Sequence, residues 1–397
     1  MLKNFCVSLF IVFIFSCNDL YKDNSSHNSS IIVNSERNLN SNLFNVIKEL
    51  RILQLKDENG KDFYFDLKPK KIIKYNGNIY IKPNDFQIIQ FDSTGVYKSR
   101  ISLAESKLIN HKEITDFIVD ENMNNIILHD FQKQRLSVYD LNLNFLYTIK
   151  VGYNFTAFEK YKDHFYLFTS KHRNKVDDFF YDYDIIVTDT NFNLLNTFLP
   201  FEHEKFPVMR IKKLNPFYIT ENNLFFNDVV SDTIYKLTHD TIVSDVFYYY
   251  DNKTLPSNIR KGSHEALLNY IQDDQTSINE FDFLANTKSI SENYIISSYN
   301  NGKRQKYIIT NKNYDTVLEY QSSDKNNDLG MIFENNLFDS HTDRFITGLS
   351  IENFIIMYGN NELNQLFNSQ EKLFIDKLQN QNQSKYIILS YEVSEFN

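Results

Sequence analysis

Residues 114–150 read ITDFIVDENMNNIILHDFQKQRLSVYDLNLNFLYTIK. This stretch contains four short runs rich in β-branched and aromatic residues, each closed by a turn rich in Asn and Asp. The runs are Ile114–Val119, Asn125–His129, Arg135–Asp140 and Phe145–Lys150. Four strands joined by tight turns predict one antiparallel meander, which is too small to be stable alone but can stack on copies of itself.

Copies of this pattern recur along the chain. The third strands of three successive blocks end at Asp92, Asp140 and Asp189, which lie 48 and 49 residues apart, and Thr238 follows after another 49. In chain order, the further runs of these blocks are Lys71–Tyr75, Asn78–Lys82, Gln87–Asp92, Val96–Ile101, His164–Thr169, Tyr183–Asp189, Leu194–Leu199, Arg210–Thr220, Asn223–Asn227, Thr233–Thr238 and Ile242–Tyr250. A period near 49 is typical of propeller blades, so the sequence predicts an all-β fold, a β-propeller of four-stranded antiparallel blades.

The spacing changes after the fourth block. The residue that ends the third strand of the fifth block, Asn311, comes 73 residues after Thr238. The excess is explained by a helical insertion at residues 251–280, in which Ser263–Asp274 has an N-cap and an apolar side. The sixth block is irregular: a predicted strand at Asn353–Tyr358 precedes a second predicted helix, Glu362–Leu378, with a helical apolar stripe.

A lone early strand, Arg51–Leu55, can close the ring by pairing with the last strand, Lys385–Val393. Such a shared blade removes the open edges that a ring would otherwise leave. The sequence therefore predicts six blades over residues 45–397. Seven blades remain an alternative, because the sixth block is irregular.

The first residues have the features of a secretory signal. Lys3 supplies a positive charge, and Phe5–Phe15 forms an apolar core that as a helix covers about half of a bilayer's hydrocarbon. Residues 14–17, Ile-Phe-Ser-Cys, resemble the bacterial lipobox, in which the cysteine is acylated. We therefore expect a signal peptide over residues 1–17, lipid attachment at Cys17 and a flexible polar tether over residues 18–44; a plain signal peptide cleaved elsewhere is the alternative.

Several motifs resemble those of the six-bladed β-propeller lipoproteins of Bacteroidota, relatives of the NHL-type propellers. They are Asn76–Ile81, Gln90–Gly95, Ile114–Asp120, Ser231–Tyr235, Tyr299–Lys303 and Asn327–Leu329. The resemblance implies a six-bladed propeller with helical insertions and a location in the cell envelope, but no defined activity. A Gly-rich loop that the family often carries after its first blade is replaced here by Leu103–Glu113.

Composition narrows the possible partners. The 397 residues carry a net charge of −9 and no run dense in Lys or Arg, so a nucleic-acid partner is not expected. The chain has two cysteines, and Cys6 lies inside the expected signal peptide. A mature chain would keep only the acylated Cys17, which argues against thiol catalysis and Cys-ligated metal. Trp is absent, which weakens but does not remove a sugar-stacking site.

No candidate catalytic, cofactor or metal residue stands out. His264-Glu265 lacks the second histidine of a zinc-protease motif, because Leu268 occupies its place. The acidic stretch Asp177–Asp184 offers oxygens for Ca²⁺, yet alternating aromatic residues and Asp also fit a strand with one wet face, which we favour. Tyr248–Tyr250 leads into the insertion, and we expect these side chains to pack in the core. If the propeller holds a ligand, its site is expected at the channel mouth beneath residues 251–280.

The leading functional hypothesis is a non-catalytic, lipid-anchored protein of the cell envelope, with the outer membrane as its expected location, whose propeller binds a small molecule, a glycan or a protein. No cofactor is expected. The alternative is a propeller hydrolase or lactonase in which Ca²⁺ in the central channel polarises the substrate. That alternative requires Asp, Glu and Asn from innermost strands of different blades to converge. A third hypothesis, a transmembrane sensor, lacks a spanning helix.

Overall fold

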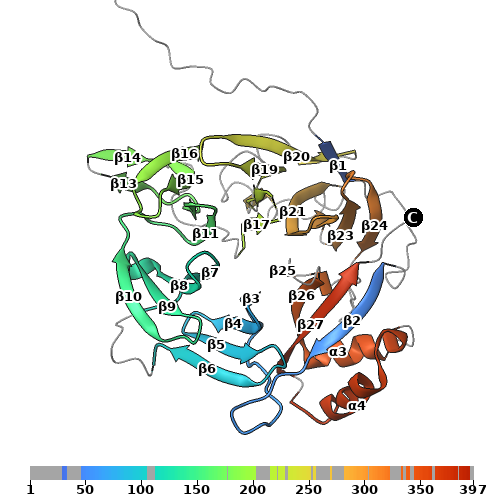
Figure 1. Ribbon diagram of the computed structural model, residues 1–397. Helices are drawn as coiled ribbons and strands as arrows, with labels where there is room; N and C mark the ends of the chain where they lie inside the picture. Colours follow the sequence, from blue (N-terminus) through green and yellow to red (C-terminus); the bar gives the residue numbers. More distant parts are fainter. Residues whose placement is uncertain are drawn as a thin grey trace, which may run out of the picture.

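The computed structural model describes the chain with gaps. The described residues are 29–33, 46–104, 112–176, 178–202, 215–220, 222–228, 231–251, 254–255, 269–270, 281–302, 304–321, 332–333, 337–339, 344–359, 363–382 and 384–393. They form a ring of six sheets around a central axis (Figure 1). The prediction of a six-bladed β-propeller with four-stranded antiparallel blades is therefore confirmed, and the seven-bladed alternative is wrong.

The blades follow one another along the chain. Blade 1 contains β3 (Lys71–Tyr75), β4 (Asn78–Asn84), β5 (Gln87–Asp92) and β6 (Tyr97–Ser102), and blade 2 contains β7 (Asp116–Asp120), β8 (Asn125–Asp130), β9 (Arg135–Asp140) and β10 (Phe145–Lys150). Blade 3 contains β11 (Ala157–Tyr161), β12 (His164–Phe168), β15 (Tyr183–Thr188) and β16 (Leu194–Pro200), and blade 4 contains β17 (Phe217–Ile219), β18 (Leu224–Phe226), β19 (Thr233–Leu237) and β20 (Ile242–Tyr250). Blade 5 contains β21 (Asp282–Ile290), β22 (Tyr294–Asn301), β23 (Arg304–Asn311) and β24 (Thr316–Gln321).

The residues that mark the repeat share one structural role at the corner between the third and fourth strands. Asp92 accepts hydrogen bonds from the backbone N–H groups of Thr94 (2.8 Å) and Val96 (3.0 Å). Asp140, Asp189 and Asn311 each accept the equivalent pair of bonds from the residues two and four positions later. The side chain thus satisfies the turn's own backbone donors, which is why Asp or Asn recurs at this position.

Blade 6 is built from both ends of the described chain. It contains β25 (Leu337–Asp339), β26 (Arg344–Ser350), β27 (Tyr386–Val393) and, as its fourth strand, β2 (Ile47–Leu53). β2 runs antiparallel to β27, with Arg51 opposite Ser390. The predicted closure of the ring by an early strand is confirmed, although β2 begins and ends a few residues before the predicted Arg51–Leu55.

Blade 4 has a fifth strand that the sequence analysis did not predict. Residues 29–33, expected to belong to a flexible tether, form β1 (Ser29–Val33), which pairs in parallel with β20. The physical reason is burial: Ile31 and Val33 are fully buried in the core between blades 4 and 5. The expectation of a tether is therefore wrong for these five residues.

Two helices lie beside blade 6 (Figure 1). The strand predicted at Asn353–Tyr358 is wrong, because these residues belong to helix α3 (Ile351–Tyr358), which Ser350 caps and which buries Ile351, Phe354 and Met357. The predicted helix Glu362–Leu378 is divided into a 3₁₀ turn, η6 (Leu363–Leu366), and α4 (Ser369–Leu378), since Asn368 forms a capping box with Glu371. The helix predicted at Ser263–Asp274 lies almost entirely outside the described residues.

The remaining short elements decorate blades 2 and 3. A 3₁₀ turn, η2 (Phe131–Lys133), links β8 to β9, and a hairpin of β13 (Asn174–Val176) and β14 (Phe179–Tyr181) extends from blade 3 between β12 and β15. Among the described residues, no helix is both long and apolar enough to cross a membrane.

The hydrophobic core consists of layers between neighbouring blades. One cluster joins blades 1 and 2 through Tyr80 and Phe117, and another joins blades 6 and 1 through Ile388 and Ile79. Clusters of the same kind occupy the other interfaces between blades. Because each blade packs only on its neighbours, the innermost strands are left to surround the axis, where polar side chains gather.

Candidate functional site in the central channel

A cavity of about 530 Å³ lies at the centre of the ring. Its lining comes from all six blades, with one example from each being Lys71, Asp116, Glu159, Tyr218, Ile290 and Ile346. Small-molecule sites in proteins commonly have volumes of about 300–1,000 Å³ and combine apolar walls with a few placed polar groups. The channel is therefore the candidate site that the described residues offer.

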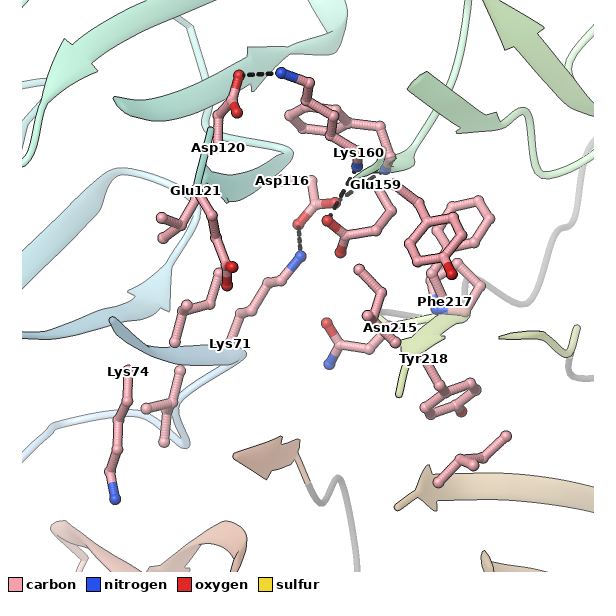
Figure 2. Close-up of a pocket in the computed structure, with 18 of the residues that line it drawn as sticks. Lys71, Lys74, Asp116, Asp120, Glu121, Glu159, Lys160, Asn215, Phe217 and Tyr218 are labelled. Carbon is pink, nitrogen blue, oxygen red and sulfur yellow. Dashed lines mark hydrogen bonds and ion pairs between the residues drawn. The ribbon is translucent and has the colours of Figure 1, made fainter. Parts of the chain in front are cut away.

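Asp116, at the start of β7, connects three blades inside this cavity. Its Oδ1 accepts a hydrogen bond from Lys71 Nζ of blade 1 (3.0 Å), and its Oδ2 accepts one from the backbone N–H of Phe158 of blade 3 (3.1 Å). Both side chains are buried, at 4% exposed for Asp116 and 12% for Lys71. Figure 2 shows this pair in the middle of the site. A buried pair of this kind gains little net stability over an apolar pair, but loss of one partner is costly.

A second buried ion pair lies further along β7 and joins it to β11 of blade 3. Lys160 Nζ of β11 is 2.6 Å from Asp120 Oδ2 of β7 (Figure 2), and both side chains are less than a tenth exposed. Asp116 and Asp120 are four residues apart on one strand, so their side chains emerge on the same side. The two pairs therefore join blade 2 to both of its neighbours along the channel wall, to blade 1 through Lys71 and to blade 3 through Lys160.

Glu159 has an unusual protonation equilibrium. Burial raises the pKa of its carboxyl to about 7, and the nearby charges of Asp116 and Glu121 act in the same direction. Lys71 and a hydrogen bond from the backbone N–H of Lys160 oppose the rise. A carboxyl that titrates near neutral pH can both donate and accept a hydrogen bond, which suits ligand binding and acid–base chemistry alike.

Three polar groups of the wall lack a protein partner. In the part of the chain that the structure describes, Tyr161 Oη, Asn215 Oδ1 and Ser289 Oγ are buried and have no hydrogen-bond partner. They come from blades 3, 4 and 5. Each of these oxygens has less than 1 Å² of exposed surface, so it is enclosed within the wall and is not presented to the cavity. By contrast, Tyr218 donates its hydroxyl to the carbonyl of Thr287 (2.8 Å), which holds its ring in place.

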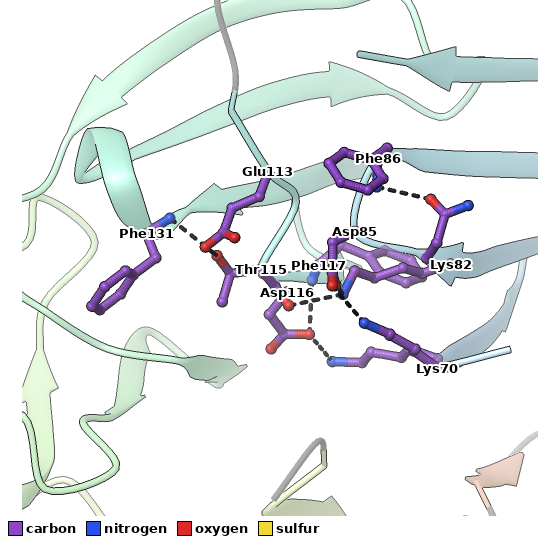
Figure 3. Close-up of polar contacts among 11 residues, drawn as sticks. Lys70, Lys82, Asp85, Phe86, Glu113, Thr115, Asp116, Phe117 and Phe131 are labelled. Atoms are coloured by element: carbon purple, nitrogen blue, oxygen red, sulfur yellow. Dashed lines mark hydrogen bonds and ion pairs between the residues drawn. The ribbon is translucent and has the colours of Figure 1, made fainter. Parts of the chain in front are cut away.

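A polar cluster beside Asp116 supports the channel wall from one side (Figure 3). Lys82, which is 2% exposed, donates to Asp85 Oδ1 (2.8 Å) and to the carbonyl of Thr115 (3.0 Å), and Lys70 donates to Asp85 Oδ2 (2.5 Å). Burial lowers the pKa of Lys82, although Asp85 opposes this. These bonds tie the turn after β4 to the residue that precedes Asp116, so the cluster positions the site.

The residues singled out from the sequence lie elsewhere. In the acidic stretch, Asp182 forms a bidentate ion pair with Arg173, and Asp184 pairs with Lys171. Among the described residues, no group of three or more His, Cys, Asp and Glu side chains is arranged to hold a metal ion. Tyr248 is buried and hydrogen-bonded to Thr287 and Ser297, so it packs between blades 4 and 5.

Other predicted features lie outside the described residues. These are the lipid-attachment residue Cys17, the His264-Glu265 pair and nearly all of the 251–280 insertion, beneath which the site was expected. The channel residues were missed because β11 was not predicted, and it carries Glu159, Lys160 and Tyr161. The run Ala157–Tyr161 did hold a signal, since a four-stranded block requires one more strand before His164.

Comparisons with known proteins agree with the fold. A family model described as a 6-bladed beta-propeller matches residues 21–347. A candidate exported protein from Bacteroides fragilis is 17% identical, with a TM-score of 0.68 over 92% of this chain and 100% of its own. A DUF4221 family member from Bacteroides vulgatus is 12% identical, with a TM-score of 0.46 over 88% of this chain and 99% of its own.

Virginiamycin B lyase from Staphylococcus aureus is 10% identical, with a TM-score of 0.39 over 75% of this chain and 81% of its own. No curated protein matches the chain. At these identities, the likeness to the Bacteroides fragilis protein shows a shared fold.

Proposed function

Because the chain belongs to the DUF5128 family of six-bladed β-propellers, we propose that it is a binding scaffold of the cell envelope that holds a small ligand in its central channel without transforming it. The observation that carries this proposal is the cavity of about 530 Å³ that all six blades line. Ligands commonly bind where a rigid scaffold presents a few convergent polar groups in a concave site.

The polar groups of the cavity support a binding role. Two ion pairs, Lys71–Asp116 and Lys160–Asp120, are buried in its wall. Apolar residues of similar size would often serve stability as well or better, so burial of charge here favours a function that needs a defined polar surface.

A thermal-shift screen of the purified full-length protein against a mixed library of sugars, amino acids, nucleotides and lipids tests this role. We expect at least one compound to raise the melting temperature of the wild type and to lose this effect in Asn215→Trp, whose ring would fill the channel. Leu195→Trp, at an exposed position on β16, is the matched control and should respond like the wild type. Hits that persist in Asn215→Trp, or no hits at all, would contradict channel binding.

The second part of the proposal is the location. The lipobox-like residues 14–17 support acylation of Cys17 and attachment to the envelope, and a similar protein from Bacteroides fragilis is a candidate exported protein. In a bacterial host, radiolabelled palmitate should label the wild type, and the protein should sediment with membranes. Cys17→Ala should remain unlabelled and lose membrane association. Membrane association of the unlabelled variant would show that another element anchors the chain.

The alternative of a propeller hydrolase is favoured by one observation. Glu159, with its pKa raised to about 7, lies beside Asp116 and shares the cavity with Asn215, so carboxylates and an amide from three blades do converge. Under this alternative, the protein would hydrolyse a lactone or glycan and contain a bound divalent ion. Turnover that Glu159→Gln abolishes, together with a stoichiometric ion by elemental analysis, would favour the enzyme.

A further inference from the structure

Glu159 lines the cavity outside both of its buried ion pairs (Figure 2). Its Oε1 accepts a hydrogen bond from the backbone N–H of Lys160 (3.1 Å), and within the described residues no hydrogen bond or ion pair engages its Oε2. The residue is only partly buried, and Oε2 is not one of the enclosed oxygens of the wall. One carboxylate oxygen is therefore available to a ligand in the channel.

The charges closest to Glu159 leave its carboxylate without a counter-charge. Burial and the charges of Asp116 and Glu121 raise the pKa of its carboxyl, whereas Lys71 lowers it. Lys71 is itself held by Asp116 at 3.0 Å, so its charge is already balanced. A positive group on a ligand would therefore supply what the protein does not place beside Glu159.

The other lysines of the cavity do not serve Glu159 either. Lys160 is paired with Asp120 at 2.6 Å, and Lys162 is exposed to solvent. Figure 2 shows the side chain of Lys74 directed away from Glu159. In the described part of the chain, none of these three ammonium groups forms an ion pair with the Glu159 carboxylate.

The size and the walls of the cavity favour an organic cation over a metal ion. A bare ion would fill only a small part of about 530 Å³, and the described His, Cys, Asp and Glu side chains form no group of three that could hold one. Ile73, Val119 and Ile219 also line the cavity and are not fully buried. They offer apolar surface to the carbon part of a ligand.

We propose that the channel binds an organic cation, whose ammonium, amidinium or guanidinium group donates hydrogen bonds to the Glu159 carboxylate while its carbon frame lies against the apolar part of the wall. This inference rests on the proposed function, since it names the ligand class of the same channel. Hydrogen bonds between two charged groups are about twice as strong as neutral ones, so this contact would dominate the choice of ligand.

Ligand-observed NMR titration of the full-length protein in an uncharged detergent tests the ligand class. Two sets of probes share a carbon frame and differ in charge: benzamidine, benzamide and benzoate, and cyclohexylamine, cyclohexanol and cyclohexanecarboxylate. Samples of detergent alone correct for partition into micelles. At least one of the two cations should bind, and its neutral and anionic counterparts should bind at least about tenfold more weakly, because they cannot form the charged pair.

The pH dependence of binding identifies the partner. A cation must displace the proton of Glu159, whose pKa is about 7, so binding should be about tenfold weaker at pH 6 than at pH 8. Benzamidine and cyclohexylamine keep their own charge across this range. No histidine lines the cavity among the described residues, so histidine titration does not confuse the measurement.

Glu159→Gln keeps the shape of the side chain and removes its charge. It should weaken binding of the cation at pH 8 by at least about tenfold and abolish the pH dependence. Thermal melting checks that the variant folds, as expected when a charge that burial disfavours is removed. Asp245→Asn is the matched control, because this carboxyl is also partly buried with a raised pKa but lies outside the cavity. It should bind the cation like the wild type.

The outcomes separate the ligand class from the binding function. If a neutral or anionic compound binds in preference and Asn215→Trp abolishes its binding, the ligand class is wrong while the channel remains a binding site. The inference is also overturned if neither cation binds, or if their binding is the same in Glu159→Gln or at pH 6 and pH 8. If no compound of any class is sensitive to Asn215→Trp, the proposed function itself fails.

Discussion

Blades 4 and 6 each take in a strand from the N-terminal part of the chain, but in opposite ways. Blade 6 has only three strands of its own, and β2 completes it in antiparallel register with β27. Blade 4 already has four strands, and β1 is added outside them in parallel with β20. One strand is therefore part of the ring, whereas the other is an addition to it.

The contacts that hold β2 in blade 6 and β1 in blade 4 also differ in chemistry. At blade 6, Arg344 donates to Glu49 Oε2 of β2 and to Glu392 Oε1 of β27, both at 2.6 Å, so charged groups hold the two ends together. Strand β1 carries no charged residue, and its contribution comes from the buried Ile31 and Val33. We infer that loss of β2 opens the ring, while loss of β1 leaves it closed. The following substitutions test this difference.

The largest effect is expected from Leu50→Asp in β2. Leu50 is fully buried in the core between blades 5 and 6, and a carboxylate there has no partner. We expect a loss of more than about 5 kcal/mol and no cooperative thermal transition by circular dichroism. Lys48→Asp, at an exposed position on the same strand, should stay within about 0.5 kcal/mol of the wild type. A normal melt of the Leu50 variant would show that β2 is dispensable.

The next effect is expected from Arg344→Met, which removes the charged link between β2 and β27. Arg344 is buried, and its loss leaves Glu392 without this cation and Glu49 with Arg51 alone. We expect urea unfolding to show a loss of about 3 kcal/mol. Adding Glu49→Gln and Glu392→Gln to this variant should restore at least half of the loss. No recovery would mean that packing by Arg344, rather than its charge, holds the joint.

A matched pair of apolar truncations compares the two added strands directly. Ile52→Ala in β2 should cost about 3 kcal/mol of global stability, because the ring depends on that strand. Ile31→Ala in β1 should cost only about 1 kcal/mol, since β1 can detach while the ring remains folded. Hydrogen exchange should then rise in β1 and β20 alone. Equal global losses in both variants would contradict the distinction between the two strands.

The smallest effect is expected in the pH dependence of stability, through Glu49 of β2. Burial alone would raise the pKa of Glu49, but hydrogen bonds from Arg344 and Arg51 hold it below its usual value. A lowered pKa stabilises the folded state above the unfolded pKa of 4.5, and this contribution disappears as pH falls through the folded value. Because Glu49 is about a third exposed, Glu49→Gln should cost only about 0.5–1 kcal/mol at pH 7, and progressively less as pH falls through the folded value.

For Asp245, on β20 of blade 4, we expect stability to depend on pH in the opposite direction. Burial raises the pKa of its carboxyl, so its stabilising contribution is present at low pH and is lost as pH rises through the folded value. Asp245→Asn should therefore gain stability relative to the wild type as pH rises from the unfolded pKa of 3.8 through the folded value. Urea unfolding across this range measures both variants. The same pH trend in both would show that these carboxyl groups do not distinguish the blades.

Much of the fold could be predicted from local patterns. The corner residues Asp92, Asp140 and Asp189 revealed the period because each one satisfies its own turn. Asn353–Tyr358 was mistaken for a strand because a short apolar run is compatible with both a helix and a strand. The helix could have been recognised only from its N-cap, Ser350. β1 was missed because five residues in a polar segment gain order only by burial against a distant strand.

The candidate site was harder to predict than the fold. Lys71, Asp116 and Glu159 are separated by more than forty residues from one to the next, and their convergence follows from how blades pack around the axis. No local pattern distinguishes a strand that lines the channel from one at the rim. The raised pKa of Glu159 likewise arises from burial by neighbouring blades, which a sequence motif does not encode.

The pairing of β2 with β27 also constrains how the molecule assembles. Arg51 and Ser390 lie opposite each other across 339 residues of chain, so the strand made first must wait for the one made near the end of synthesis. Contacts this distant in sequence form slowly and leave an unpaired edge exposed meanwhile. The last blade can be completed only after Tyr386–Val393 has been made, so β2 keeps an unpaired edge, open to pairing with another chain, until that point.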